Sequence, residues 1–367
     1  MDKTKTLIVI FIGILVIAIV LGISFFSEKT ETQKIISQSN SQENDNADIS
    51  IVAQNLEIPW EIVFLPDSRM LITERPGRLL LIGRDKQTIE ISGVVHSGEG
   101  GLLGLALHPN FASNHWLYLY STFRESGRLM NRVERYRLDG TRLVERQVMV
   151  DGILAAANHD GGRMVFGPDG KLYVTTGDAE QPTSAQDKNS LNGKILRVSD
   201  DGSGLEVYSY GHRNPQGLAW DNQGRLWATE HGPSGTASGW DEVNLIGFGK
   251  NYGWPEIKGE QTKAGMVTPV IQSGSDDTWA PSGMVIVGDQ LLFTGLRGEA
   301  VYSARIDGDK LADFKRHFVG EWGRLRTIKL GPDGWFYLLT NNRDGRGKVG
   351  SGDDKIIRIK ADQLLDK

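Results

Sequence analysis

The sequence predicts an all-β protein, a six-bladed β-propeller preceded by an N-terminal transmembrane anchor. The main observation is a hairpin pattern that recurs six times after residue 50. Each copy has a short apolar run, a turn containing Pro, Asp, Asn or Gly, and a second apolar run rich in strand-forming residues. Such turn residues accept positive φ at low cost, which is typical of β-hairpins. The copies span residues 60–74, 103–121, 162–178, 216–230, 282–296 and 326–340.

The spacing of the copies is the second observation that favours a propeller. Successive copies begin roughly 43 to 66 residues apart, and several strands per repeat at about this period are typical of propeller blades. Six copies predict six blades, with a strand from one terminus completing the sheet of the other terminus. Helical periodicity is scarce after residue 50, which disfavours the all-α and α/β classes. A pair of β-sandwiches is the alternative, but it explains six similar turns less well.

Composition excludes several classes of function. The chain has 367 residues, a formal net charge of −5 and no cysteine. We expect no nucleic-acid partner, because such partners are held by basic surfaces. The lack of cysteine excludes disulfides, thiolate nucleophiles and Cys-ligated zinc. The sequence also lacks an HExxH zinc helix, a GxSxG nucleophile elbow and a Gly-rich phosphate loop before a helix.

The N-terminal segment predicts export. Lys3 and Lys5 precede residues 7–26, which carry no charge and would span about 30 Å as a helix. We expect residues 1–26 to anchor the chain in a membrane, with the propeller, residues 51–367, outside the cytoplasm at the cell surface or in the periplasm. A cleaved signal peptide is the alternative, and the protein would then be secreted. The polar residues 27–50 predict a disordered linker.

Basic loops beside the hairpins predict an anionic ligand. Gly-rich or charged loops flank the hairpins at residues 98–104, 158–163, 211–217 and 230–255, and basic loops follow at 295–299 and 322–327. Arginine forks in such loops suit carboxylates and phosphates. A structural salt bridge remains the alternative for each arginine alone. The arginines are Arg213, Arg297, Arg324 and Arg326.

Five segments carry a resemblance to a known family. They are GLLGLALHPNF, NHDGGRMVFGPDGKLYVTTGD, GHRNPQGLAW, EHGP and DEVNLIGFGKNYGWP. Together they resemble the quinoprotein sugar dehydrogenases of the glucose/sorbosone dehydrogenase family, in particular its aldose sugar dehydrogenase branch. The resemblance covers roughly residues 51–360, in order. It implies a six-bladed propeller that binds pyrroloquinoline quinone (PQQ) and calcium.

The resemblance also implies a reaction. Aldose sugars would be oxidised at the anomeric carbon to lactones, with hydride transfer to the quinone and electrons passed to an external acceptor, which is a quinone, a dye or a redox protein. Two alternatives from other classes stay open. One is a calcium-dependent propeller lactonase or hydrolase, which would need several side-chain ligands for the metal. The other is a non-catalytic surface binding module.

Roles for individual residues follow from the matched positions. His159 resembles the catalytic base, and imidazole suits proton transfer near neutral pH. Asp178 matches an acid that orients this histidine. Arg213 and Asn214 resemble the pair that contacts the quinone oxygens, where a fixed cation would stabilise developing charge. The residues expected to clasp the cofactor carboxylates are Arg297, Arg324 and Arg326.

Three matched positions depart from the glucose-specific relatives. Arg297 stands where those relatives carry lysine, which keeps the charge but changes the hydrogen-bond geometry. Glu99, expected to contact the cofactor, stands where those relatives carry glutamine, and Asn341 stands near where they carry aspartate. An acidic Glu99 beside an anionic cofactor would be unfavourable unless it is protonated or paired. The resemblance therefore leaves the charge state of this position open.

Calcium is expected at two places. The backbone carbonyls of Gly232 and Pro233 match those that hold the cofactor calcium, and calcium accepts neutral carbonyl oxygens readily. Glu242 and the carbonyl of Tyr252 resemble a second, structural calcium site. The remaining histidines are expected to be turn or packing residues: His96, His108, His115, His212, His231 and His317.

Overall fold

Each of the six predicted hairpins forms the two inner strands of a four-stranded β-sheet in the computed structural model, which describes residues 47–233 and 239–365. The first three sheets contain β2 (Pro59–Phe64), β3 (Met70–Glu74), β4 (Arg78–Ile82) and β5 (Lys86–Glu90); β6 (Leu102–Leu107), β7 (Trp116–Glu125), β8 (Arg128–Asp139) and β9 (Arg142–Leu154); β10 (Met164–Phe166), β11 (Leu172–Thr176), β12 (Lys194–Val198) and β13 (Glu206–Tyr210).

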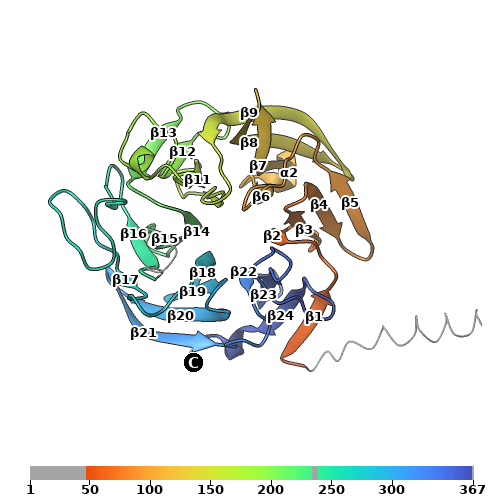
Figure 1. Cartoon of the computed structure of the whole chain (residues 1–367). Coiled ribbons are helices and arrows are strands. Elements are labelled where there is room, and N and C mark those ends of the chain that lie inside the picture. The colour runs from red at the N-terminus through yellow and green to blue at the C-terminus, as the bar shows by residue number, and fades with distance from the viewer. Residues whose placement is uncertain (1–46, 234–238, 366–367) are drawn as a thin grey trace, which may run out of the picture. The chain divides into compact units, whose positions relative to one another are not determined.

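The other three sheets follow the same order. They contain β14 (Pro215–Trp220), β15 (Leu226–Glu230), β16 (Glu242–Ile246) and β17 (Ile271–Gln272); β18 (Pro281–Val287), β19 (Gln290–Gly295), β20 (Ala300–Asp307) and β21 (Lys310–His317); β22 (Leu325–Leu330), β23 (Trp335–Thr340), β24 (Ile356–Lys360) and β1 (Ile49–Ala53). The sheets form a ring around a central axis (Figure 1). The prediction of six blades is confirmed, and the sandwich alternative is wrong.

The ring is closed by pairing of the two ends of the chain. Strand β1 from the N-terminal side lies beside β24, the last strand of the chain, and completes the sixth sheet. Backbone hydrogen bonds continue the contact beyond β1, because the N–H of Leu56 donates to the carbonyl of Asp354 at 3.0 Å and the N–H of Asp354 donates back at 3.1 Å. This closure was expected from the sequence, and it leaves no open edge between the first and last blades.

An aspartate fixes the turn of several hairpins, which explains why the Pro-Asp-Gly pattern repeats. Asp169 accepts a hydrogen bond from the backbone N–H of Lys171 at 3.1 Å through one oxygen and from the hydroxyl of Tyr173 at 3.0 Å through the other. Gly170 beside it has φ of 75°, a conformation that glycine adopts without strain. Asp333 makes the equivalent two bonds in the last blade.

Apolar side chains of the inner strands pack between neighbouring blades. Trp60 of β2 is 1% exposed and belongs to one buried cluster with Tyr120 of β7 and Val174 of β11. The cluster therefore joins residues from the first three blades, and it is the burial of these faces that holds the ring together. In Figure 1 the first strand of each labelled blade lies nearest the axis and the last lies at the rim.

The hairpin geometry gathers the predicted site loops at one end of the ring. In an antiparallel hairpin, the residue before the first strand and the residue after the second strand lie at the same end. Loop residues 157–163 precede β10 and residues 177–180 follow β11, so both lie at this end. The other five hairpins place their loops in the same way.

The predicted N-terminal segments cannot be compared with the structure. The expected anchor, residues 1–26, and nearly all of the expected linker lie outside the described residues, while β1 begins at Ile49, inside the last two residues of that linker. Across residues 47–233 and 239–365, no helix is both long enough and apolar enough to cross a bilayer. Both N-terminal interpretations stay predictions.

Candidate active site

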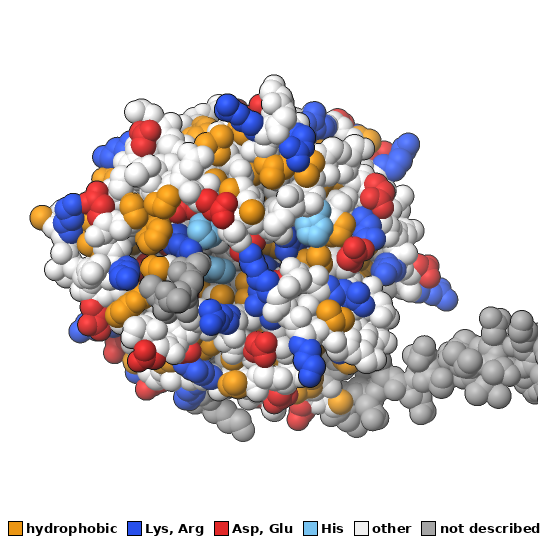
Figure 2. Space-filling model, in the orientation of Figure 1, with side chains coloured by type: hydrophobic (Ala, Val, Ile, Leu, Met, Phe, Trp, Pro, Cys, Tyr) orange, Lys and Arg blue, Asp and Glu red, His pale blue; other side chains and the backbone are white. Residues whose placement is uncertain are grey.

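A cavity of about 420 Å³ opens among the loops at this end of the ring. On the face seen in Figure 2, histidine and Lys or Arg side chains gather near the middle of the ring. Residues from the second to the sixth blade and from the loops between them contribute to the wall. The lining residues are Glu99, Asn158, His159, Glu180, Arg213, His231, Gly232, Pro233, Asp241, Thr278, Ala280, Leu296, Arg297, Arg324 and Arg346.

His159 lines the cavity and forms a hydrogen-bonded pair with Asp178, which lies behind it. The Nδ1 atom of His159 lies 2.7 Å from Oδ1 of Asp178, whose side chain is 1% exposed against 15% for the histidine. Asp178 also accepts the backbone N–H of Glu180 at 2.9 Å and the indole N–H of Trp254 at 2.8 Å. Because the carboxylate accepts at Nδ1, that nitrogen carries the ring proton, and Nε2 is left to accept one.

Close backbone packing fixes the position of this histidine. His159 has φ of 66°, in the left-handed region, and its carbonyl accepts the N–H of Ala179 at 3.2 Å. A Cβ on Gly177 would lie 1.8 Å from the His159 carbonyl oxygen, and a Cβ on Gly98 would lie 2.1 Å from that of Ala157. Only glycine fits at these two positions, which explains the glycine of the TTGD segment and the first glycine of the GEGG segment.

Arg213 lies beside this pair. Its backbone N–H donates to the Glu230 carboxylate, and its guanidinium contacts the carbonyl of His231 at 3.5 Å and lies 5.3 Å from the ring of Trp254. Burial lowers the pKa of Arg213, and Asp178 is the strongest of the acids that oppose this change. Trp254 thus contacts both Asp178 and Arg213, which fixes their separation. Asn214 is fully buried and does not line the cavity.

Two further predicted arginines line the cavity. Arg324 donates twice to Asp344, from Nε at 3.0 Å and from Nη2 at 2.8 Å, and its Nη1 donates to the carbonyl of Leu296 at 3.2 Å. Arg297 is exposed, and within the described residues no hydrogen bond or ion pair involves its side chain. Arg324 is therefore held in a fixed direction, while Arg297 can turn toward a ligand.

Arg326 does not reach the cavity wall. It is buried in a network in which it donates to Asn341 Oδ1 at 2.9 Å, Gln216 Oε1 at 2.6 Å and Ser282 Oγ at 3.4 Å. Burial lowers the pKa of Arg326 to about 9. Its expected role in the cofactor clasp stays a prediction, because both Arg326 and Asn341 are buried and do not line the cavity.

The Glu99 carboxylate is bound by protein donors, which compensate the negative charge that the sequence left unexplained. Its Oε1 accepts Nη1 of Arg346 at 2.6 Å, and its Oε2 accepts the backbone N–H of His159 at 3.0 Å and the amide of Asn214 at 3.4 Å. Burial opposes the charge, but His231, Arg346 and the His159 N–H outweigh it and lower the pKa of Glu99 to about 2. Sequence reasoning missed Arg346, although its basic loop directly follows the sixth hairpin.

The Gly232–Pro233 segment is held by a buried acid. Asp241 accepts the N–H of Gly232 at 2.8 Å through one oxygen and the N–H groups of Trp279 and Ala280 at 2.7 and 2.9 Å through the other. Burial raises the pKa of Asp241 in spite of these bonds. Gly232 and Pro233 both line the cavity, and their role as carbonyl ligands for calcium stays a prediction.

His231 is a cavity residue that sequence reasoning assigned to packing. Its Nε2 atom is buried and has no hydrogen-bond partner in the part of the chain that the structure describes. Burial lowers the pKa of His231 to about 3, so the ring is neutral near pH 7. The EHGP segment could have indicated that His231 lies at the site, because this histidine directly precedes Gly232 and Pro233, whose carbonyls are the predicted calcium ligands.

The second expected calcium site lies away from the cavity. Glu242 is opposite Glu230 across β15 and β16, and it accepts the amide of Asn244 at 3.0 Å. Burial and the neighbouring Glu230 raise the pKa of Glu242 to about 8, and Oδ1 of Asn244 is buried without a partner in the described chain. Tyr252 is buried with its hydroxyl bonded to Leu245. Carboxylate and amide oxygens suit calcium, and this site stays a prediction.

The cavity wall fits an anionic ligand. Its arginines present positive charge, while its acids Glu99, Glu180 and Asp241 are already engaged by protein donors. The guanidinium of Arg297, which makes no hydrogen bond or ion pair within the described residues, supplies further donors. Across residues 47–233 and 239–365, no group of three or more His, Cys, Asp or Glu side chains could hold a metal ion, so a metal here would depend on carbonyl oxygens.

Comparison with known proteins agrees with this geometry. The sequence model of the glucose/sorbosone dehydrogenase family matches residues 56–357. The aldose sugar dehydrogenase of Escherichia coli (strain K12) is 35% identical over 348 residues, covering 81% of this chain and 91% of that protein. Quinoprotein glucose dehydrogenase B of Acinetobacter calcoaceticus is 32% identical over 274 residues, covering 62% of this chain and 56% of that one.

A solved structure is similar over the same region. The PQQ-bound form of the aldose sugar dehydrogenase of Streptomyces coelicolor is 38% identical, with a TM-score of 0.77, over 85% of this chain and 97% of that one. The residues that the family model matches, 56–357, include strands of all six blades but not β1.

Proposed function

Because the chain belongs to the glucose/sorbosone dehydrogenase family, we propose that it is a PQQ- and calcium-dependent dehydrogenase that oxidises aldoses at the anomeric carbon to lactones. The observation that carries this proposal is His159, which lines a cavity together with four arginines and is hydrogen-bonded to Asp178 at 2.7 Å. A base that can take a hydroxyl proton and a cationic surface that can hold an anionic oxidant are the two parts that such a reaction requires.

The residues that would hold the cofactor are those whose donors face the cavity. Arg297 and Arg324 would bind carboxylates of PQQ, and Arg213 would lie beside a quinone oxygen. The carbonyls of Gly232 and Pro233 would bind calcium. When bound, PQQ would supply the oxidising power, because a quinone can accept a hydride, which is two electrons and one proton.

The protein's own part in the chemistry is proton transfer and positioning. Nε2 of His159 takes the proton from the anomeric hydroxyl of the sugar while hydride leaves the same carbon, so that the C–H and O–H bonds break and a C=O bond forms. Asp178 holds the ring in the tautomer that leaves Nε2 free and stabilises the imidazolium that results. Arg213 places a fixed positive charge beside the pair. The two electrons then pass to an external acceptor.

Reconstitution tests the proposal. The full chain is mixed with PQQ and calcium chloride, and we expect a shifted quinone absorbance and reduction of an artificial dye that depends on added aldose. A chelator added before PQQ should prevent the spectral shift, because the proposed calcium ligands also border the cofactor cavity. No spectral change and no aldose-dependent dye reduction would contradict the proposal. The lactonase alternative is checked separately by lactone hydrolysis in the absence of PQQ.

A further inference from the structure

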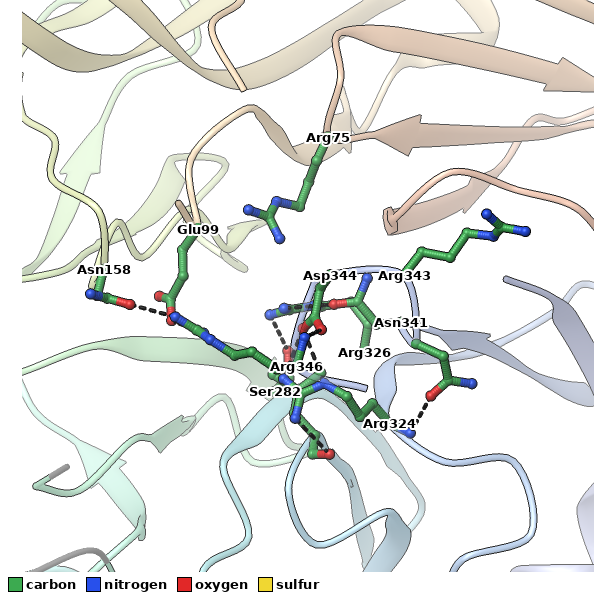
Figure 3. A network of polar contacts seen from close by, with 12 residues as sticks. Arg75, Glu99, Asn158, Ser282, Arg324, Arg326, Asn341, Arg343, Asp344 and Arg346 are labelled. Atoms are coloured by element: carbon green, nitrogen blue, oxygen red, sulfur yellow. Dashed lines mark hydrogen bonds and ion pairs between the residues drawn. The ribbon is translucent and has the colours of Figure 1, made fainter. Parts of the chain in front are cut away.

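Arg346 connects the last blade to the loops that carry the catalytic base. It lies between β23 and β24, and its guanidinium donates to Glu99 at 2.6 Å and also to the side-chain carbonyl of Asn158. Glu99 precedes the second blade and Asn158 precedes the third, so these contacts link residues 247 and 188 positions apart. Figure 3 shows Arg346 extending across the site to both side chains.

The carboxylate that Arg346 binds is itself bound to the base. The second oxygen of Glu99 accepts the backbone N–H of His159 at 3.0 Å, and the amide of Asn214 lies 3.4 Å from it. Glu99 is 14% exposed, while Arg346 is 49% exposed. Arg346 therefore restrains, from the solvent side, a buried carboxylate that fixes the backbone of His159.

The same contact changes the charge of the cavity. Glu99 lines the cavity in which the anionic cofactor would lie, and an unpaired carboxylate there would repel it. The ion pair with Arg346 cancels this charge. Arg324, a predicted clasp residue that also lines the cavity, binds Asp344 and makes no hydrogen bond or ion pair with Glu99 in the described chain.

We propose that Arg346 is a positioning residue that holds the His159 backbone through Glu99 and cancels the charge of Glu99 where the cofactor binds. The second part rests on the proposed function, whereas the first part does not. Arg346 is not itself a cofactor ligand in this proposal. Removing the charge of Glu99 should therefore compensate for the loss of Arg346.

Four variants of the full chain test the charge effect: Arg346→Gln, Glu99→Gln, the double variant and Arg343→Gln. Arg343→Gln is the matched control, because it removes the same charge from the same loop. The Arg343 side chain points away from Glu99 in Figure 3 and donates to the carbonyl of Asp353. In titrations with PQQ and calcium, followed by quinone absorbance, Arg346→Gln should raise the half-saturating PQQ concentration about tenfold, a coupling usual for contacting charged residues. The double variant should return it to near the wild-type value, and Arg343→Gln should not change it.

Two results of the titration would overturn the charge effect. If the double variant is as weak as Arg346→Gln alone, Arg346 acts directly on the cofactor. If Arg346→Gln binds PQQ like the wild type, the charge of Glu99 needs no partner. Failure of the wild-type chain to bind PQQ at all would instead refute the proposed function.

Hydrogen exchange tests the positioning effect without any cofactor. Amide exchange of the segment 157–161 is measured in the cofactor-free protein. Arg346→Gln should accelerate exchange there, because the acceptor of the His159 N–H loses its restraint, and Arg343→Gln should leave it unchanged. Equal exchange in the wild type and Arg346→Gln would overturn the positioning role, whatever the PQQ titrations show.

Discussion

Asp178→Asn isolates the contribution of the carboxylate behind the proposed base. Asp178 accepts three hydrogen bonds, two at Oδ1 from His159 and Glu180 and one at Oδ2 from Trp254. The side-chain oxygen of an asparagine can take the place of Oδ1, which accepts from both His159 and Glu180. The hydrogen bond to His159 then survives without the negative charge. The ring then stays in the productive tautomer but gains less stabilisation as it takes up the proton.

The size of the loss follows from that charge. A hydrogen bond to a charged group contributes about 1.5–3 kcal/mol, and tenfold corresponds to about 1.4 kcal/mol. Because a neutral hydrogen bond to His159 remains and contributes about 0.5–1.5 kcal/mol, removing the charge should cost about 1–1.5 kcal/mol. Proton transfer should therefore slow by roughly 5- to 12-fold, which is less than the loss expected when the imidazole itself is removed.

Single-turnover mixing is the suitable assay for this variant. PQQ-loaded Asp178→Asn is mixed with a saturating aldose, and reduction of the quinone is followed by absorbance, so that slow steps at the electron acceptor do not contribute. PQQ affinity, measured in parallel, should be unchanged because Asp178 does not line the cavity. A rate equal to that of the wild type would refute the assignment of Asp178 as the orienting acid.

Three other outcomes are expected. Arg324→Gln should raise the half-saturating PQQ concentration by roughly 10- to 150-fold, the range for hydrogen bonds to charged groups; unchanged reconstitution would mean that Arg324 serves only Asp344. Arg326→Met should lower the midpoint of thermal unfolding, because it leaves the buried amides of Gln216 and Asn341 without their donor; an unchanged midpoint would show that this network is not stabilising. Burial raises the pKa of Asp160 to about 7, above its value in an unfolded chain, so the wild type should lose stability as pH rises from about 4 to 7. Asp160→Asn should flatten this dependence in calorimetry, and an equal slope in both proteins would contradict the argument.

The fold was predictable because its signal is local. Each blade contains a hairpin of about 15 residues whose turn chemistry stands in the sequence, as at Asp169 and Asp333. Six such hairpins need no long-range information to be counted. The closure by β1 could be predicted only because a propeller must leave few open edges.

The site was predictable only in part, because the sequence does not show how deeply a side chain is buried or which distant residues pair. Arg324 and Arg326 look equivalent in the segment WGRLRT, but two residues of a strand span about 6.6 Å. Arg324 therefore lies at the cavity, while Arg326 lies deeper, in the network with Gln216. The bond between Arg346 and Glu99 joins residues 247 positions apart, and no local pattern indicates it.

The central claim is that His159 takes the proton of the sugar, and His159→Ala tests it most directly. PQQ and calcium should still bind, because their expected ligands are other residues. The single-turnover rate of quinone reduction by an aldose should fall roughly 10²- to 10⁴-fold, the usual contribution of a positioned general base. A variant that binds PQQ normally and reduces it at the wild-type rate would contradict the account.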